Sequence, residues 1–378
     1  MTKQLFQLNL QQHFGGGEVY THFLCQGLDA LNIGYTLLTH PKADYWHKLS
    51  FGNTKIQPIT PDLDGVIAAL GDVPAVLLTH GGIDKKWRKQ LKSNGHRLIA
   101  IAHMPLYGRD PSSYDGYDGV IGVSQYVIES LQDAKVENIY PEPWYGVASL
   151  SRHIEEGAPI LQASCYDWDL RKGRDRILSW LEPAYELFRP KVQWQKQDGL
   201  SIGIVSRITP IKQFPLMFEH IAQALSEVPN LNVEIFGSGG YASVRDLRKA
   251  LGPLGDRVRF WGFQKNVEGI YSQLDFLIAG LPEKEALGLN VIEAQHCNLP
   301  VLAVKASPFV ETVVDGKTGF LFEDPRNDNG ADLKAILTDI QNGQRPMPQP
   351  QQHKAHLDEF SLPVFTKRVE KSMSWLLS

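Results

Sequence analysis

The stretch LSIGIVSRITPIK, residues 200–212, carries the two features that decide the fold. Its first part, Leu200–Val205, is a short apolar run typical of a strand buried on both faces of a parallel sheet. Its second part is a turn that carries Arg207 and Lys212. Ligands of open parallel sheets bind beyond the carboxyl ends of the strands. The stretch therefore predicts an α/β domain with an anion-binding turn, although two solvated surface cations would explain the same residues.

Apolar runs of this kind alternate with helix-length segments in both halves of the chain. In the second half they lie at residues 200–205, 233–236, 258–260, 276–279 and 301–304. In the first half they lie at residues 5–10, 35–38, 75–79, 98–102 and 119–123. This alternation is the signature of parallel βαβ units, and a chain of 378 residues has room for two such domains. We therefore predict two tandem Rossmann-like domains.

Charge and cysteine content narrow the class of protein. The formal net charge of −4 does not suit a nucleic-acid-binding protein. The three cysteines are widely spaced and match neither a zinc site nor a disulfide framework, which favours a reducing compartment. No apolar stretch approaches the roughly 18 residues that span a bilayer. We expect a cytoplasmic protein, either soluble or peripheral at the inner face of the cytoplasmic membrane.

The segment EALGLNVIEA, residues 285–294, follows the predicted strand at 276–279. Its glycine turn predicts a helix start, where leading amides can point at a diphosphate, namely those of Gly288, Leu289 and Asn290. Glu293 lies about one turn further along and can reach ribose hydroxyls, while Glu285 is placed to accept hydrogen bonds from a sugar. An exposed helix start with two solvated carboxylates is the alternative interpretation.

Two features of the first half also follow predicted strands. The glycines at 15–17 follow the first strand but do not form GxGxxG, which argues against an NAD-dependent dehydrogenase. His103 follows the strand at 98–102, and His80 has a similar position one strand earlier. Both histidines are candidates for a catalytic or a capped structural role. The DxD sequences at 62–64 and 167–169 do not end predicted strands, so we expect no metal site.

The stretch from 150 to 199 separates the two halves. It contains a basic start followed by an aromatic-rich helical pattern, with the cations Arg171, Lys172, Arg174 and Arg176. Such a helix can face a membrane or an acidic lipid-linked acceptor. The simpler interpretation is an amphipathic helix that packs beside the hinge with its charges in water.

Together these motifs resemble the retaining GT-B glycosyltransferases of family 4. The matching pieces are Gly15–Gly17, His103, Val123–Ser124, Ser206–Lys212, residues 235–239, residues 258–263, Glu285 with Glu293, and residues 314–320. The resemblance is strong over about residues 200–322 and diffuse over 1–145. It departs from the usual Glu-Gly-Phe-Gly turn at Ala286 and Leu287, and from a common glycine at Gln213.

The resemblance implies two Rossmann-like domains whose parallel sheets face each other across a cleft. It implies an acceptor-binding domain over 1–195 with a variable hinge region at 150–195, a nucleotide-sugar-binding domain over 196–358, and a C-terminal helix over 359–378 that returns to the first domain. The implied catalytic residues are His103, Arg207, Lys212 and Glu285. The implied donor-binding residues are Gly16, Gly17, Ser206, Phe263, Gln264, Gly288, Leu289, Asn290 and Glu293.

The expected activity is retaining transfer of a sugar from a UDP- or GDP-sugar to a saccharide or lipid-linked acceptor, in polysaccharide, lipopolysaccharide or glycolipid assembly. No cofactor or metal is expected, and peripheral membrane association stays open. A nucleotide-sugar epimerase of the same fold and a non-catalytic donor-binding subunit remain as alternatives.

Overall fold

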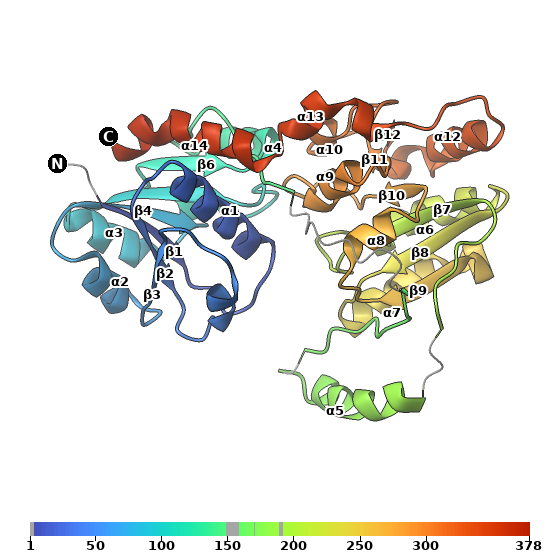
Figure 1. Ribbon diagram of the computed structural model, residues 1–378, viewed down its shortest axis with the longest axis horizontal. Helices are drawn as coiled ribbons and strands as arrows, with labels where there is room; N and C mark the ends of the chain where they lie inside the picture. Colours follow the sequence, from blue (N-terminus) through green and yellow to red (C-terminus); the bar gives the residue numbers. More distant parts are fainter. Residues whose placement is uncertain (1–3, 149–158, 170, 189–191) are drawn as a thin grey trace. The chain divides into compact units, whose positions relative to one another are not determined.

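The structure, a computed structural model, describes residues 4–148, 159–169, 171–188 and 192–378. The chain divides into two compact units, one formed by Met1–Ser149 with Asp358–Ser378 and the other by Leu150–Leu357. Each unit is built on one six-stranded parallel sheet with helices packed against it (Figure 1). The predicted α/β class with two Rossmann-like domains is confirmed. Within the described residues, no helix is long and apolar enough to cross a membrane.

The first unit contains the strands β1 (Gln4–Asn9), β2 (Tyr35–Thr39), β3 (Lys55–Pro58), β4 (Ala75–His80), β5 (Arg97–Ala102) and β6 (Gly119–Gly122). Its main helices are α1 (Gly16–Ala30), α2 (Leu63–Leu70), α3 (Lys85–Ser93), α4 (Gln125–Asp133) and α14 (Leu362–Leu377). The strand order is β3-β2-β1-β4-β5-β6, so the direction of winding reverses between β1 and β4. Helix α14 packs on α1, where the rings of Tyr20 and Phe365 meet edge to face at 5.6 Å.

The second unit contains β7 (Leu200–Val205), β8 (Leu231–Phe236), β9 (Val258–Gly262), β10 (Phe276–Ile278), β11 (Val301–Val304) and β12 (Gly319–Phe322). Its helices are α5 (Gly173–Phe188), α6 (Phe214–Ser226), α7 (Tyr241–Ala250), α8 (Val267–Tyr271), α9 (Leu289–His296), α10 (Phe309–Thr312), α11 (Pro325–Asp328) and α12 (Ala331–Gln341), with α13 (Lys354–Asp358) at its end. The strand order is β12-β11-β10-β7-β8-β9, which reverses between β7 and β10. The edge strands β3 and β12 were not among the predicted runs.

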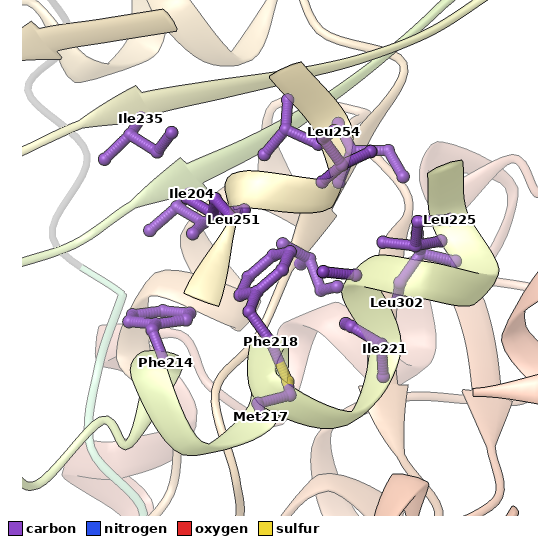
Figure 2. Close-up of a cluster of buried hydrophobic side chains, with 14 of the residues drawn as sticks. Ile204, Phe214, Met217, Phe218, Ile221, Leu225, Ile235, Leu251, Leu254 and Leu302 are labelled. Atoms are coloured by element: carbon purple, nitrogen blue, oxygen red, sulfur yellow. The ribbon is translucent and has the colours of Figure 1, made fainter. Parts of the chain in front are cut away.

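Both faces of the second sheet are buried, as its apolar strands require. On one face, Phe214, Met217, Phe218 and Ile221 of α6 pack against strand residues such as Ile204 (Figure 2). On the other face, Val205 and Leu277 belong to a separate core cluster. Neighbouring residues of one strand therefore enter different cores, which explains why these strands read as continuous apolar runs rather than as alternating patterns.

The segment before β7 lies with the second unit, whereas the sequence placed 150–195 in the first domain. Ile160 and Trp194 are buried in one core cluster of the second unit. The Ala163 N–H donates to Trp261 O at 2.9 Å, at the end of β9. Backbone pairing of this kind leaves no periodic side-chain pattern, which is why the sequence did not indicate the boundary.

Candidate functional site

The candidate site lies beyond the carboxyl ends of the second sheet, where the strand order reverses between β7 and β10. A hollow of about 150 Å³ opens there, lined by Val205, Ser206, Arg207, Phe236, Gly237, Ser238, Phe263, Gln264, Val267, Ile270, Tyr271, Asn290 and Glu293. The lining includes the sequence-predicted site residues Ser206, Arg207, Phe263, Gln264, Asn290 and Glu293. The structure brings these six together from three separate segments, namely the turn after β7, the turn after β9 and helix α9.

Lys212 connects the hollow with the turn that precedes α9. Its Nζ donates to Glu285 Oε2 at 2.5 Å and to Asn290 Oδ1 at 3.4 Å. The Nδ2 group of Asn290 donates to Val205 O at 3.3 Å, so this side chain ties the end of β7 to the start of α9. The Lys212 and Glu285 side chains are only 21% and 15% exposed. Their attraction is therefore screened less than that of a surface ion pair.

The first residues of α9 offer free backbone donors. Gly288 is the N-cap with φ of 82°, and no side chain caps the helix. The first intrahelical acceptor is Gly288 O, which Val291 and Ile292 use. The N–H groups of Gly288, Leu289 and Asn290 precede this bond, and such leading amides favour a bound anion.

Arg207 lines the hollow and makes a weak contact with Asp167. Its Nη2 lies 3.2 Å from Asp167 Oδ2, and the arginine side chain is 68% exposed. An exposed pair of this kind contributes about 1 kcal/mol or less. A bound anion can therefore replace Asp167 as the partner of the guanidinium at little cost.

Three of the four carboxylates in the two DxD sequences have structural partners. Asp62 caps α2 by accepting from the Gly65 N–H at 2.8 Å. Asp167 contacts Arg207, and Asp169 accepts from Arg171 Nε at 2.8 Å. Over the described ranges of the chain, no group of three or more His, Cys, Asp or Glu side chains is arranged to hold a metal ion.

The remaining predicted donor contacts also line the hollow. Glu293 lies within α9, and its charge adds to burial in raising the pKa of Tyr271 well above its ordinary value. Phe263 presents a largely exposed ring just after β9. The side-chain amide of Gln264 donates to Leu161 O and to Trp261 O, both at 2.8 Å. A largely exposed ring beside a fixed amide is suited to stacking and hydrogen bonding of a planar base.

In the first unit, His80 is the last residue of β4, His103 follows β5, and the two side chains contact each other. The distance from His103 Nε2 to His80 Nδ1 is 3.0 Å. Burial lowers the pKa of His103 to about 4. Burial, with a smaller contribution from His103, lowers the pKa of His80 well below its ordinary value. Both imidazoles are therefore neutral near pH 7, and one donates a hydrogen bond that the other accepts.

A group of buried polar side chains next to these histidines was missed from the sequence. Asn9 Nδ2 donates to Thr21 Oγ1 at 2.9 Å and to Glu18 Oε1 at 3.3 Å. Thr21 Oγ1 lies 3.2 Å from His80 Nδ1, and Gln7 Oε1 lies 3.4 Å from His80 Nε2. The available signal was the pair of polar residues two positions apart in β1, Gln7 and Asn9, since both enter the same face of an otherwise apolar strand.

Gly16 and Gly17 are the first two residues of α1 in the first unit. His103 is the first residue of the loop after β5. No other atom lies within 4 Å of the position that a Cβ would take at either glycine. The preceding Gly15 has an extended backbone with φ of −160°. Neither a close contact nor a left-handed backbone therefore requires glycine at residues 16 and 17.

Residues 187–347 match the sequence model of the family described as glycosyl transferases, group 1. We refer to this segment, 161 of the 378 residues, as the glycosyl transferase domain. The glycosyl transferase domain contains all the predicted site residues of the second unit, from Ser206 to Glu293.

Curated relatives of the glycosyl transferase domain are similar over the same part of the chain. N-acetyl-alpha-D-glucosaminyl L-malate synthase of Bacillus anthracis is 28% identical over 153 residues, which cover 39% of this chain and 39% of the relative. D-inositol 3-phosphate glycosyltransferase of Streptomyces avermitilis is 33% identical over 139 residues, which cover 34% of this chain and 30% of the relative. The match thus spans about two fifths or less of the length of these relatives.

Solved structures extend the similarity of fold beyond the glycosyl transferase domain. HepE of Anabaena in complex with UDP superposes with a TM-score of 0.69 at 16% identity and covers 98% of this chain and 99% of HepE. Sucrose-phosphate synthase of Thermosynechococcus elongatus superposes with a TM-score of 0.67 at 15% identity, covering 99% of both chains. The chain therefore has the GT-B fold that the sequence predicted.

Proposed function

We propose that the protein transfers a sugar from a nucleoside-diphosphate sugar to an acceptor hydroxyl, with retention at the anomeric carbon. The observation that carries the proposal is the contact of Lys212 with Glu285 and Asn290 at the start of α9, beside the hollow that Arg207 lines. Two cations and the leading amides of a helix at one place suit a diphosphate.

Each part of the donor has a proposed partner. The diphosphate would be held by Arg207, Lys212 and the amides of Gly288, Leu289 and Asn290, with Ser206 beside them. Glu293 would accept hydrogen bonds from the ribose, and the base would lie on Phe263 and Gln264. Glu285 would contact the transferred sugar. Its carboxylate, which accepts a hydrogen bond from Lys212, would then move to accept hydrogen bonds from the sugar as well. From the first unit, Gly16 and Gly17 would border the phosphate, and His103 would orient the sugar.

The proposed step is a front-face displacement, as expected for retaining enzymes of family 4. The bond from the anomeric carbon to the diphosphate oxygen breaks, and the acceptor oxygen bonds to that carbon on the same face. The acceptor proton passes to the departing diphosphate. Negative charge builds on this leaving group, where Arg207, Lys212 and the helix amides would stabilise it. Because these groups supply the positive charge, we expect turnover to persist in EDTA.

We propose a uridine donor ahead of a guanosine donor. The HepE structure contains UDP, and the pneumococcal O-GlcNAc transferase GtfA, whose TM-score is 0.64, was solved with UDP and GlcNAc. The acceptor would be a saccharide or a lipid-linked saccharide, in polysaccharide or glycolipid assembly. Binding and turnover of a GDP-sugar in place of a UDP-sugar would show that the base is guanine rather than uracil.

The test combines donor screening with product analysis. Thermal shifts against UDP- and GDP-sugars identify the donor, and NMR of the product with saccharide acceptors reports the anomeric configuration. We expect one nucleotide to stabilise the protein and the product to keep the donor's configuration. An inverted product contradicts the mechanism. A new nucleotide sugar formed without acceptor indicates an epimerase, and donor binding without any turnover indicates a non-catalytic subunit.

A further inference from the structure

Helix α5 of the second unit has an uncovered apolar face. The side chains of Trp180, Ile177 and Leu181 are 79%, 61% and 46% exposed. Their spacing places them on one side of the helix. Figure 1 shows α5 set apart from the helices that cover the sheet of this unit. A contiguous exposed apolar face of this kind marks an interaction surface.

The opposite side of α5 is attached to the second unit. Glu182 accepts a hydrogen bond from Trp168 Nε1 at 2.6 Å, and Asp175 is buried. The guanidinium of Arg174 lies 4.7 Å from the centre of the Tyr241 ring. At about 100° per residue, Asp175 and Glu182 lie roughly opposite Trp180, Ile177 and Leu181. The apolar face therefore points away from the body of the unit.

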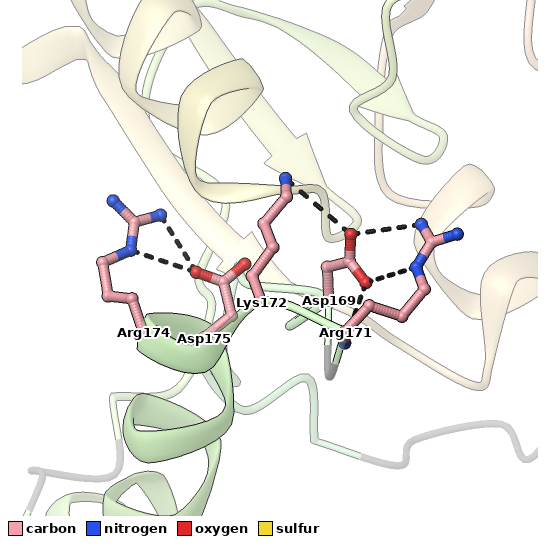
Figure 3. A network of polar contacts seen from close by, with 5 residues as sticks. All are labelled: Asp169, Arg171, Lys172, Arg174 and Asp175. Carbon is pink, nitrogen blue, oxygen red and sulfur yellow. Dashed lines mark hydrogen bonds and ion pairs between the residues drawn. The ribbon is translucent and has the colours of Figure 1, made fainter.

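Cationic side chains border this apolar face. At about 100° per residue, Arg176 lies along one edge of the face and Arg174 along the other, but the Arg174 guanidinium is turned to Asp175, at 2.9 Å (Figure 3). Arg171 and Lys172, just before the helix, share one carboxylate, Asp169, at 2.8 and 3.7 Å (Figure 3). A single carboxylate offsets only one of these two cations. The exposed side of α5 is therefore apolar along its centre and positively charged along the Arg176 edge and at the helix start.

We propose that α5 docks the second unit onto an anionic lipid surface. The helix would lie in the plane of the surface, with the Trp180 ring among the lipid headgroups and with Arg176 and the cations at the helix start, Arg171 and Lys172, next to the phosphates. A central apolar stripe with an indole and with flanking cations is the pattern of an in-plane amphipathic helix. The proposal concerns a surface outside the donor site and does not depend on the donor chemistry.

Vesicle binding by the full chain tests the proposal. We expect sedimentation with vesicles that contain phosphatidylglycerol and little sedimentation with pure phosphatidylcholine vesicles. Trp180→Gln with Ile177→Ser should weaken binding by roughly tenfold or more, because apolar insertion is lost. Arg176→Gln should weaken it about fivefold, and added salt should act in the same direction. Trp180→Phe should retain binding while most of the fluorescence quenching by brominated lipid disappears.

Two matched variants control for general effects of substitution. Val73→Ser removes an exposed apolar side chain from a loop of the first unit, and Lys249→Gln removes an exposed cation from α7. Both should bind vesicles as the parent does. Equal vesicle binding by the parent and the Trp180→Gln, Ile177→Ser variant overturns the proposal. Absence of binding to anionic vesicles would also overturn it. The same holds if the parent self-associates and the Trp180→Gln, Ile177→Ser variant does not, because the apolar face would then bind a second copy of the chain. Sugar transfer to a water-soluble acceptor, measured in parallel, should be unchanged and reports separately on the proposed function.

Discussion

Replacement of Lys212 by alanine removes the cation that joins Glu285 to the start of α9. In the proposed mechanism this side chain faces the charge that builds on the leaving diphosphate. Loss of such a partner lowers kcat by about 100- to 1000-fold, or roughly 3 to 4 kcal/mol. The same change leaves the largely buried Glu285 carboxylate without its 2.5 Å partner. Because the pair is partly exposed, we expect the free energy of unfolding to fall by only about 1 to 3 kcal/mol.

The assay is steady-state transfer with the donor that thermal screening identifies. Lys334→Ala is the matched control, because Lys334 also pairs with a glutamate of the second unit, Glu227, on an exposed surface. It should change kcat and stability little. Circular dichroism of both variants checks that they fold. Transfer by Lys212→Ala within about threefold of the parent would refute a role for this cation in stabilising the transition state.

Two further variants test other parts of the account. His103→Gln should make the stability of the protein less sensitive to acid. The pKa of folded His103 is about 4, below its value in the unfolded chain, so the unfolded state binds the proton first as the pH falls. Between about pH 6.5 and pH 4 this lowers the free energy of unfolding by up to about 1.4 kcal/mol per pH unit. Urea unfolding at pH 7 and pH 5 measures this, and an unchanged pH dependence contradicts it; the exposed His13→Gln is the control. Gly288→Ala should lower both the Tm and the affinity for nucleotide, because its φ is 82° and a Cβ would lie 3.1 Å from Phe309 Cε1. Gly316→Ala, with φ of 70° and no atom within 4 Å of a Cβ, should lower the Tm less and leave nucleotide affinity unchanged.

Strong local patterns were sufficient to predict most of the second unit. The run Leu200–Val205 forms β7 with the predicted bounds, and the helix start predicted at the glycine turn of residues 285–294 is the start of α9 at Leu289. By contrast, β3 (Lys55–Pro58) is a half-exposed edge strand, so burial imposes no apolar run on it. Edge strands of this kind are set by the neighbouring strand rather than by their own sequence.

Contacts between distant parts of the chain were the harder part to predict. The polar network of the first unit joins Asn9, Thr21 and His80, and only the fold brings these residues together. The expected amphipathic helix forms as α5. The simpler interpretation packed its apolar face against the protein, whereas Trp180 on that face is exposed. Helical periodicity predicts which residues share a face, but it does not predict what covers that face.

The central claim is that a nucleoside diphosphate binds where Arg207, Lys212 and the first amides of α9 meet. Amide hydrogen exchange with and without UDP, read by mass spectrometry on short peptides, tests it most directly. We predict that UDP slows exchange in peptides that cover Gly288–Asn290 and Ser206–Arg207. Unchanged exchange there, at a UDP concentration shown to shift the Tm, would contradict the claim.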